Sequence, residues 1–216
     1  MSAHTILFDL DGTLIDSTEA ILESFSVALD HYGSKKPHDE MVKELIGYPL
    51  ETMFERVGVD SALVKEHVRR YKEHYREISC QKTRLLPGAK EAVERACEFA
   101  RVGIVTTKTG KYSRELLEYF GLMDWFEVLI GREDVQNPKP HPEPVCRALE
   151  MMSADPDKTW MIGDTVLDIE SAKGAGVTPF ALVCGYGEEN ELAKASEYLA
   201  ADALAAVSVI RSIVRL

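Results

Sequence analysis

Residues 5–13 read Thr5-Ile6-Leu7-Phe8-Asp9-Leu10-Asp11-Gly12-Thr13. The first four form a short apolar run that is typical of a buried parallel strand, and Gly12 favours a turn just after it. Side chains two apart in an extended segment point the same way, so Asp9 and Asp11 are predicted to lie side by side where the strand ends. Two like charges repel each other and are costly to bury. A bound cation and different roles for the two acids would explain this arrangement.

The simpler interpretation of this stretch is a strand followed by an Asp-Gly turn, in which Asp11 is only a turn residue. That interpretation accounts for Asp11 and Gly12 but leaves Asp9 unexplained at the end of an apolar strand. We therefore favour a functional role for the two acids, and other parts of the chain support this choice.

The composition indicates a globular protein with an excess of acidic residues. The 216 residues include 25 Lys and Arg and 36 Asp and Glu, for a net charge of −11, which argues against nucleic acid or an anionic membrane surface as the main partner. No apolar run is long enough to span a bilayer, and the N-terminus lacks the pattern of a signal peptide. The four cysteines show no CxxC spacing and are predicted to be free thiols in a reducing cytoplasm.

Between residues 16 and 85 the pattern is helical. The first helix carries an apolar stripe at helical spacing, and Gly33 ends it. Further helices are expected at about 39–46, 50–57 and 61–78. No strand-like run interrupts this stretch, so it is predicted to be an all-helical insertion.

From residue 87 onwards, helices and strands alternate. Strands are expected at 102–106, 126–130, 159–162 and 178–183, and helices at 88–100, 112–120, 142–152, 165–175 and 204–214. Such alternation predicts right-handed crossovers and a doubly wound parallel sheet, to which the strand at 5–8 also belongs. The chain is therefore predicted to be an α/β protein with a Rossmann-like core domain (1–15 and 86–216) and an inserted α-helical cap domain (16–85).

Polar residues follow the predicted strands of the core. Thr106 and Thr107 come at the end of one strand, Asp164 follows another, and Asp168 lies one turn into the next helix. Lys139 stands between two prolines, which stiffen the backbone around it. In open parallel sheets, ligands bind beyond the carboxyl ends of the strands. The sequence therefore predicts that these residues gather at one edge of the sheet.

Each of these residues also has an ordinary explanation. Thr106 fits a strand, Asp164 fits a helix cap, and an isolated lysine such as Lys139 is usually solvated. The explanations fail together, because they require acids, a hydroxyl and a lysine to collect at one rim of one sheet by chance. Mg²⁺ prefers a few carboxylates, waters and a substrate phosphate oxygen as ligands. Asp9 and Asp164 suit that role, with Asp168 supporting them from outside the metal's own ligands.

This sequence resembles the haloacid dehalogenase (HAD) superfamily, whose four motifs it matches in order. The matching residues are Asp9-Leu10-Asp11-Gly12-Thr13, Thr106, Lys139 and Gly163-Asp164-Thr165-Val166-Leu167-Asp168. The match runs over essentially the whole chain, and the set is far more specific than any single motif. The helical insertion resembles the small α-helical cap of subfamily I. Residues 8–17 and 45–50 are similar to segments of the phosphoglycolate phosphatases and of their pyrophosphatase relatives.

The resemblance implies a Mg²⁺-dependent phosphatase that acts on a small phosphorylated metabolite. Asp9 would attack phosphorus and form an aspartyl-phosphate. Asp11 would start protonated beside the charge of Asp9, give its proton to the leaving oxygen and then take one from water; its backbone carbonyl would bind the metal. The resemblance further implies a metal site of Asp9, Asp11, Asp164 and Asp168, and a phosphate site of Leu10, Gly12, Thr106, Thr107 and Lys139.

Other activities of the superfamily fit these residues less well. Dehalogenases lack the second acid, and phosphonate hydrolases, which use a cap lysine, have a different first motif. Sugar-phosphate mutases more often carry Val or Ile where this chain has Thr13, and they have a basic residue in the early cap loop, whereas residues 47–50 include no cation. A non-catalytic binding protein on this fold would not need both Asp9 and Asp11.

The identity of the substrate is left open by these motifs. Inorganic pyrophosphatase and sugar-phosphate mutase activities are the alternatives to a phosphoglycolate-like monoester. Tyr48 and Arg56 in the cap are candidates for contacting a small carboxylate, although Tyr48 can equally pack against Leu50. We expect no nucleic acid or membrane partner, and a monomer or weak homodimer.

Overall fold

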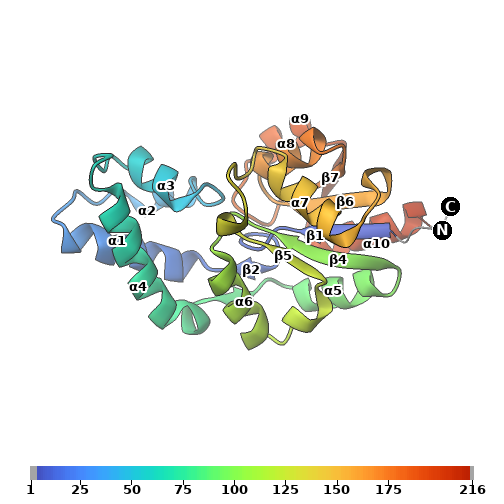
Figure 1. Ribbon diagram of the computed structural model, residues 1–216, viewed down its shortest axis with the longest axis horizontal. Coiled ribbons are helices and arrows are strands. Elements are labelled where there is room, and N and C mark those ends of the chain that lie inside the picture. The colour runs from blue at the N-terminus through green and yellow to red at the C-terminus, as the bar shows by residue number, and fades with distance from the viewer. Residues whose placement is uncertain (1–3, 215–216) are drawn as a thin grey trace.

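A computed structural model describes residues 4–214 and consists of an α/β core and a helical cap beside it (Figure 1). Six parallel strands form the core sheet in the order β5-β4-β1-β6-β7-β8. This order confirms the predicted doubly wound sheet, with the chain running outward in both directions from β1. The strands are β1 (His4–Phe8), β4 (Ala100–Val105), β5 (Val128–Ile130), β6 (Thr159–Gly163), β7 (Thr178–Leu182) and β8 (Tyr198–Ala200).

Helices cover both faces of the sheet, which is why β1 is apolar at every position from Ile6 to Phe8. Ile6 and Phe8 pack into one face and Leu7 into the other. The first face is covered by α5 (Ala89–Cys97), α6 (Gly110–Tyr119) and α10 (Ala203–Val214), and the second by α7 (Glu143–Met152), α8 (Val166–Gly174) and α9 (Glu189–Ala195). The core also contains the short 3₁₀ helices η1 (Met123–Trp125), η2 (Arg132–Asp134) and η3 (Pro156–Lys158).

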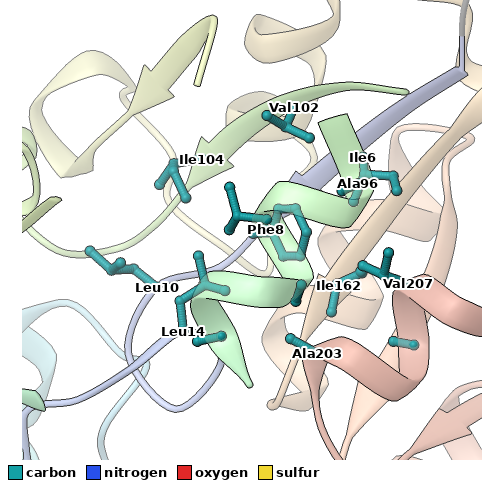
Figure 2. Close-up of a cluster of buried hydrophobic side chains, with 14 of the residues drawn as sticks. Ile6, Phe8, Leu10, Leu14, Ala96, Val102, Ile104, Ile162, Ala203 and Val207 are labelled. Carbon is teal, nitrogen blue, oxygen red and sulfur yellow. The ribbon is translucent and has the colours of Figure 1, made fainter. Parts of the chain in front are cut away.

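The largest cluster of buried side chains fixes the position of β1 and of the loop that follows it. Phe8 lies among residues of β4, β6, α5 and α10, and Leu10 and Leu14 continue the same cluster beyond the end of the strand (Figure 2). Each fully buried side chain of this size contributes about 1.5–3 kcal/mol. The loop that carries Asp9 and Asp11 is therefore anchored by apolar packing on both sides of the two acids.

The cap has a hydrophobic core of its own. Its helices are α1 (Thr18–His31), α2 (Asp39–Lys43), α3 (Leu50–Arg56) and α4 (Val64–Lys82). Phe25 of α1 stacks on Phe54 of α3 with ring centroids 4.3 Å apart, and Tyr71 of α4 meets Phe25 edge-on at 5.2 Å. The chain enters and leaves the cap through an antiparallel ribbon of β2 (Ile15–Asp16) and β3 (Arg84–Leu85).

The structure corrects the expected elements at several places. The inserted segment is not free of strands, because β2 and β3 pair at its two ends. The elements α9 and β8 lie in a stretch for which no element was expected. Strands of two or three residues are too short to show a periodic pattern, and α9 has only one fully buried residue, Leu192. None of the helices in residues 4–214 is long and apolar enough to cross a membrane.

Candidate active site

Asp9 lies at the carboxyl end of the sheet because β1 stops at Phe8. The backbone N–H of Asp9 donates to the carbonyl oxygen of Ile162 in β6 at 2.9 Å, which extends the parallel pairing by one residue. Thr106 follows β4 in the same way, with its N–H 2.9 Å from the carbonyl oxygen of Ile130 in β5. The carboxyl ends of β1 and β4 point toward the cap (Figure 1), so both residues stand at the end of the sheet that faces the cap.

Lys139 links two of the acids at the centre of the site. Its Nζ lies 2.8 Å from Asp9 Oδ1 and 2.5 Å from Asp168 Oδ1, and it donates to the carbonyl oxygen of Val105 at 3.0 Å. The side chains of Lys139 and Asp168 are 3% and 1% exposed, so solvent screens their attraction weakly. Two carboxylates thus share one ammonium, which holds both beside β4.

Asp164 is the third buried acid of the site. Its Oδ1 accepts a hydrogen bond from the Thr13 hydroxyl at 3.0 Å, and its Oδ2 accepts one from the backbone N–H of Tyr186 at 2.8 Å. Gly12 allows the first motif to pass closely over this carboxylate. It has a φ of +80°, and a Cβ at this position would stand 2.3 Å from Asp164 Oδ2.

One ammonium does not balance the charge of these acids. One oxygen from each of Asp9, Asp164 and Asp168 lies within 4.8 Å of the others, and in residues 4–214 their ion pairs are those of Lys139 with Asp9 and Asp168. Burial raises the pKa of Asp9 to about 7, against the opposing effect of Lys139. Burial, and then the charge of Asp168, raise the pKa of Asp164 well above its usual value. A cluster of oxygen donors with unbalanced negative charge suits a hard divalent cation.

Asp168 has partners on both of its oxygens. Oδ1 contacts Lys139, and Oδ2 accepts hydrogen bonds from the backbone N–H and the hydroxyl of Thr165 at 3.0 and 2.7 Å. This arrangement agrees with a supporting role for Asp168. The complete metal set of Asp9, Asp11, Asp164 and Asp168 stays a prediction.

Asp11 lies outside this cluster, in a cleft between the core and the cap. Lys108 Nζ lies 3.1 and 3.0 Å from its two carboxylate oxygens, and the Ser17 hydroxyl also donates to Asp11. The Lys108 ammonium sits over the ring of Tyr75 of the cap, 4.6 Å from the centroid. Lys108 and Ser17 both donate to Asp11, so an acid role for this residue requires one of its oxygens to carry a proton and to face the leaving group when substrate binds.

Lys108 is not among the predicted site residues. Burial alone would lower the pKa of its ammonium, but Asp11, Tyr75 and Tyr71 together outweigh burial, and the pKa is raised well above its usual value. The only signal in the sequence is its position two residues after Thr106, which places it on the same strand-end loop.

The predicted phosphate-binding threonines are held by the neighbouring loops. Thr106 is buried, and its Oγ1 accepts the backbone N–H of Lys108 at 3.2 Å. The Thr107 hydroxyl instead donates to the carbonyl oxygen of Gly47 in the cap at 2.8 Å. Thr107 therefore joins the core to the cap through its side chain, and its predicted role through the backbone amide stays a prediction.

The two other predicted phosphate contacts come from the first motif. The Leu10 side chain is fully buried in the core, so only its backbone can serve a ligand. The Gly12 N–H donates to the carbonyl oxygen of Ile15 at 2.8 Å. In this conformation Gly12 therefore does not direct its amide at a phosphate, and its visible role is the close approach to Asp164.

The cap residues predicted to contact substrate pack against each other. The Arg56 guanidinium lies over the Tyr48 ring, 4.0 Å from its centroid. Tyr48 lines the cleft, whereas Arg56 is an exposed residue outside the lining. This contact brings a positive charge to the loop at residues 47–50, so the absence of a cation in that loop weighs less against a mutase than the sequence indicated.

The cleft between core and cap has a volume of about 60 Å³. Its walls are largely apolar on the cap side, and Asp11 and Glu51 are its acids. Its cations come from three different elements. They are Lys72 of α4, Lys108 of the loop after β4 and Arg132 of η2.

The two acids of the first motif thus have different surroundings. Asp9 is buried and paired with Lys139, and it lies beside carboxylate oxygens that could bind a cation. These surroundings suit a nucleophile. Asp11 borders the cleft and is placed to exchange a proton with a group bound there. Two carboxylates with contrasting environments are a usual basis for dividing nucleophilic and acid–base roles.

Comparison with known proteins agrees with this geometry. Residues 6–182 match the sequence model of the family described as haloacid dehalogenase-like hydrolase. A curated relative from Halalkalibacterium halodurans, named pyrophosphatase PpaX, is 36% identical over 192 residues, which cover 88% of this chain and 87% of the relative.

Solved structures share the whole architecture. A haloacid dehalogenase-like family hydrolase from Streptococcus pneumoniae superposes with a TM-score of 0.86 at 25% identity and covers 96% of this chain and 98% of its own. A structure from Haemophilus somnus, described as a predicted phosphoglycolate phosphatase, has a TM-score of 0.88 at 24% identity, with 97% and 98% of the two chains covered. The second likeness shows the fold alone.

Proposed function

This chain belongs to the haloacid dehalogenase-like hydrolase family, and on that basis we propose that it is a Mg²⁺-dependent phosphatase of small phosphate monoesters. The observation that carries the proposal is the division between the two acids of the first motif. Asp9 is paired with Lys139 in a buried acid cluster, whereas Asp11 is paired with Lys108 at the cleft.

The proposed reaction has two half-reactions. A carboxylate oxygen of Asp9 forms a bond to phosphorus as the bond between phosphorus and the leaving oxygen breaks, and Asp11 gives a proton to that oxygen. Asp11 then takes a proton from water, whose oxygen attacks phosphorus and restores the Asp9 carboxylate. The Thr106 hydroxyl and the Lys139 ammonium stabilise the negative charge of the phosphoryl oxygens.

The acid cluster fits the metal that this activity requires. Asp9, Asp164 and the backbone carbonyl of Asp11 would hold Mg²⁺, and Asp168 would keep Lys139 and the metal-binding loop in place. When bound, the ion would supply positive charge that neutralises phosphate oxygens.

We expect Mg²⁺ to raise the melting temperature Tm more at pH 8 than at pH 5.5. The pKa of Asp9 is raised from 3.8 to about 7, so between these values the folded protein binds a proton that the unfolded chain has lost. Stability contributed by this group therefore falls as the pH rises through that window. A cation that binds the ionised carboxylate offsets the loss where it is largest. Thermal unfolding with and without Mg²⁺ at the two pH values measures the difference.

Two aspartate variants test the same expectation. Asp164→Asn should lose most of the gain in Tm that Mg²⁺ gives at pH 8, whereas Asp124→Asn, a change on the exposed turn η1, should keep it. Equal gains at both pH values, or a full gain in Asp164→Asn, would contradict a Mg²⁺ site at this cluster.

For the substrate we propose a phosphoglycolate-like monoester, as the similarity of residues 8–17 and 45–50 to the phosphoglycolate phosphatases implies. Inorganic pyrophosphate is the second candidate, because curated relatives at 33–37% identity are named pyrophosphatase PpaX. The test is phosphate release with Mg²⁺ from phosphoglycolate, pyrophosphate, sugar phosphates and nucleotides, together with isomerisation of a sugar phosphate. We expect the highest kcat/KM for phosphoglycolate, and isomerisation without net phosphate release would instead identify a mutase.

The proposed compartment is the reducing cytoplasm. Cys80, Cys97, Cys146 and Cys184 are all free thiols, which supports this proposal. The folded protein should therefore need no disulfide, and incubation with an oxidant should form none that stabilises the fold.

A further inference from the structure

We propose that Lys108 and Arg132 form a second anion-binding site in the cleft, which binds a negative charge on the leaving group of the substrate. This inference rests on the phosphatase activity proposed above and narrows its substrate class. It concerns residues that lie beyond the four motifs of the sequence and that come from two different loops of the core.

Lys108 is placed where a leaving group must pass. Its Nζ contacts both carboxylate oxygens of Asp11, and Asp11 is the group that would protonate the leaving oxygen. A leaving group within hydrogen-bond distance of Asp11 is therefore close to the Lys108 ammonium as well. Because the ammonium carries three N–H groups, it can retain Asp11 while it binds a ligand oxygen, or it can exchange one partner for the other.

Arg132 has hydrogen-bonding capacity that the protein does not use. One terminal nitrogen of its guanidinium donates to the carbonyl oxygen of Val135 at 3.1 Å, while its Nε is buried and has no hydrogen-bond partner within residues 4–214. A buried donor without a partner is costly unless a ligand or water satisfies it. Arg132 lines the same cleft as Lys108, and its planar fork suits a carboxylate or a phosphate.

The backbone holds these two cations together. The N–H of Arg132 donates to the carbonyl oxygen of Lys108 at 2.9 Å, and Glu133 accepts the N–H of Gly110 at 2.8 Å. Gly131 permits this contact between the loops, because a Cβ at this position would stand 2.5 Å from the Cα of Gly110. The backbone of both residues is therefore positioned by the core, while the Lys108 ammonium also lies over the Tyr75 ring of the cap.

The overall charge of the chain makes this local excess of cations informative. The net charge is −11, yet the cleft is lined by Lys72, Lys108 and Arg132 against Asp11 and Glu51. The phosphoryl group is assigned above to Lys139, which is not among the residues that line the cleft, so it does not account for these cations. A leaving group that carries a carboxylate or a phosphate accounts for them, whereas a neutral alcohol leaves them unused.

The experiment compares substrates that differ in the charge of the leaving group. Phosphoglycolate is paired with its uncharged amide, and pyrophosphate is paired with phenyl phosphate. For each pair, the ratio of kcat/KM for the charged to the uncharged substrate is measured in the full-length enzyme. Arg132→Met should lower the ratio about tenfold or more, mainly through KM, because it removes a charge-assisted hydrogen bond. Lys108→Met should lower it similarly, and Arg132→Lys should recover part of it.

A matched control is Lys111→Met, which removes an exposed lysine next to the same loop but outside the cleft. Its ratio should equal that of the unchanged protein. A loss in only one substrate pair supports the proposal and identifies the leaving group. An unchanged ratio in both Arg132→Met and Lys108→Met overturns it. If the unchanged protein releases phosphate from none of the substrates, the proposed function fails, which is a separate result.

Discussion

Asp9→Asn should abolish phosphate release while leaving the protein folded. The amide oxygen is a poor nucleophile, so the phosphoryl intermediate cannot form, and we expect a loss of roughly a thousandfold or more in kcat. The fold should tolerate the change because Asn has the same shape, and Lys139 keeps Asp168 as its partner. Removing one of the crowded buried charges should leave Tm unchanged or raise it when no metal is present.

The measurement combines steady-state kinetics, Tm and mass spectrometry of acid-quenched enzyme. The unchanged protein should carry a phosphoryl group on the peptide that contains Asp9 during turnover, and the variant should carry none. Asp124→Asn, an exposed aspartate exchanged in the same way, should keep both the activity and the phosphorylated peptide. A folded Asp9→Asn enzyme with ordinary activity would refute Asp9 as the nucleophile.

The sheet could be predicted from the sequence because its signals are local. A strand covered on both faces needs a continuous apolar run, and β1 has one from Ile6 to Phe8. The alternation of helices and strands then defines the direction of the crossovers. The ribbon of β2 and β3 could not be predicted, because its pairs, Ile15 with Leu85 and Asp16 with Arg84, join residues far apart in the chain. Neither strand is long enough to show alternation.

The residues of the candidate site likewise fall into those that the sequence predicts and those that it does not. Asp9, Thr106, Lys139 and Asp164 stand beside strand ends or in a stiff loop, so their positions follow from the fold. The ion pair of Lys108 with Asp11 depends on how the Lys108 side chain runs into the cleft, and the spacing of residues in the sequence does not indicate this. Arg132 enters the site because its backbone pairs with a loop from the neighbouring strand.

Lys139→Met should cost both activity and stability, because the lysine is the shared partner of two buried carboxylates. Removing it leaves Asp9 and Asp168 close together, with side chains 6% and 1% exposed, and without an ammonium. Breaking a buried ion pair by removing one partner costs about 3–5 kcal/mol, which corresponds to roughly 6–20 °C in Tm for a chain of this size. Loss of the cation that is proposed to contact the phosphoryl oxygens should also lower kcat by about a hundredfold or more.

The pH dependence separates this electrostatic loss from a loss of packing. Protonation of Asp9, whose pKa is raised by burial to about 7, removes the repulsion between the two carboxylates, so the deficit in Tm of Lys139→Met should shrink as the pH is lowered from 8 to 5.5. A packing defect would give the same deficit at both pH values. Lys90→Met, which removes an exposed lysine of α5, should change Tm by no more than about 1–2 °C. A deficit in Lys139→Met that does not depend on pH would show that Lys139 fills space beside β4 and does not balance the charge of the acids.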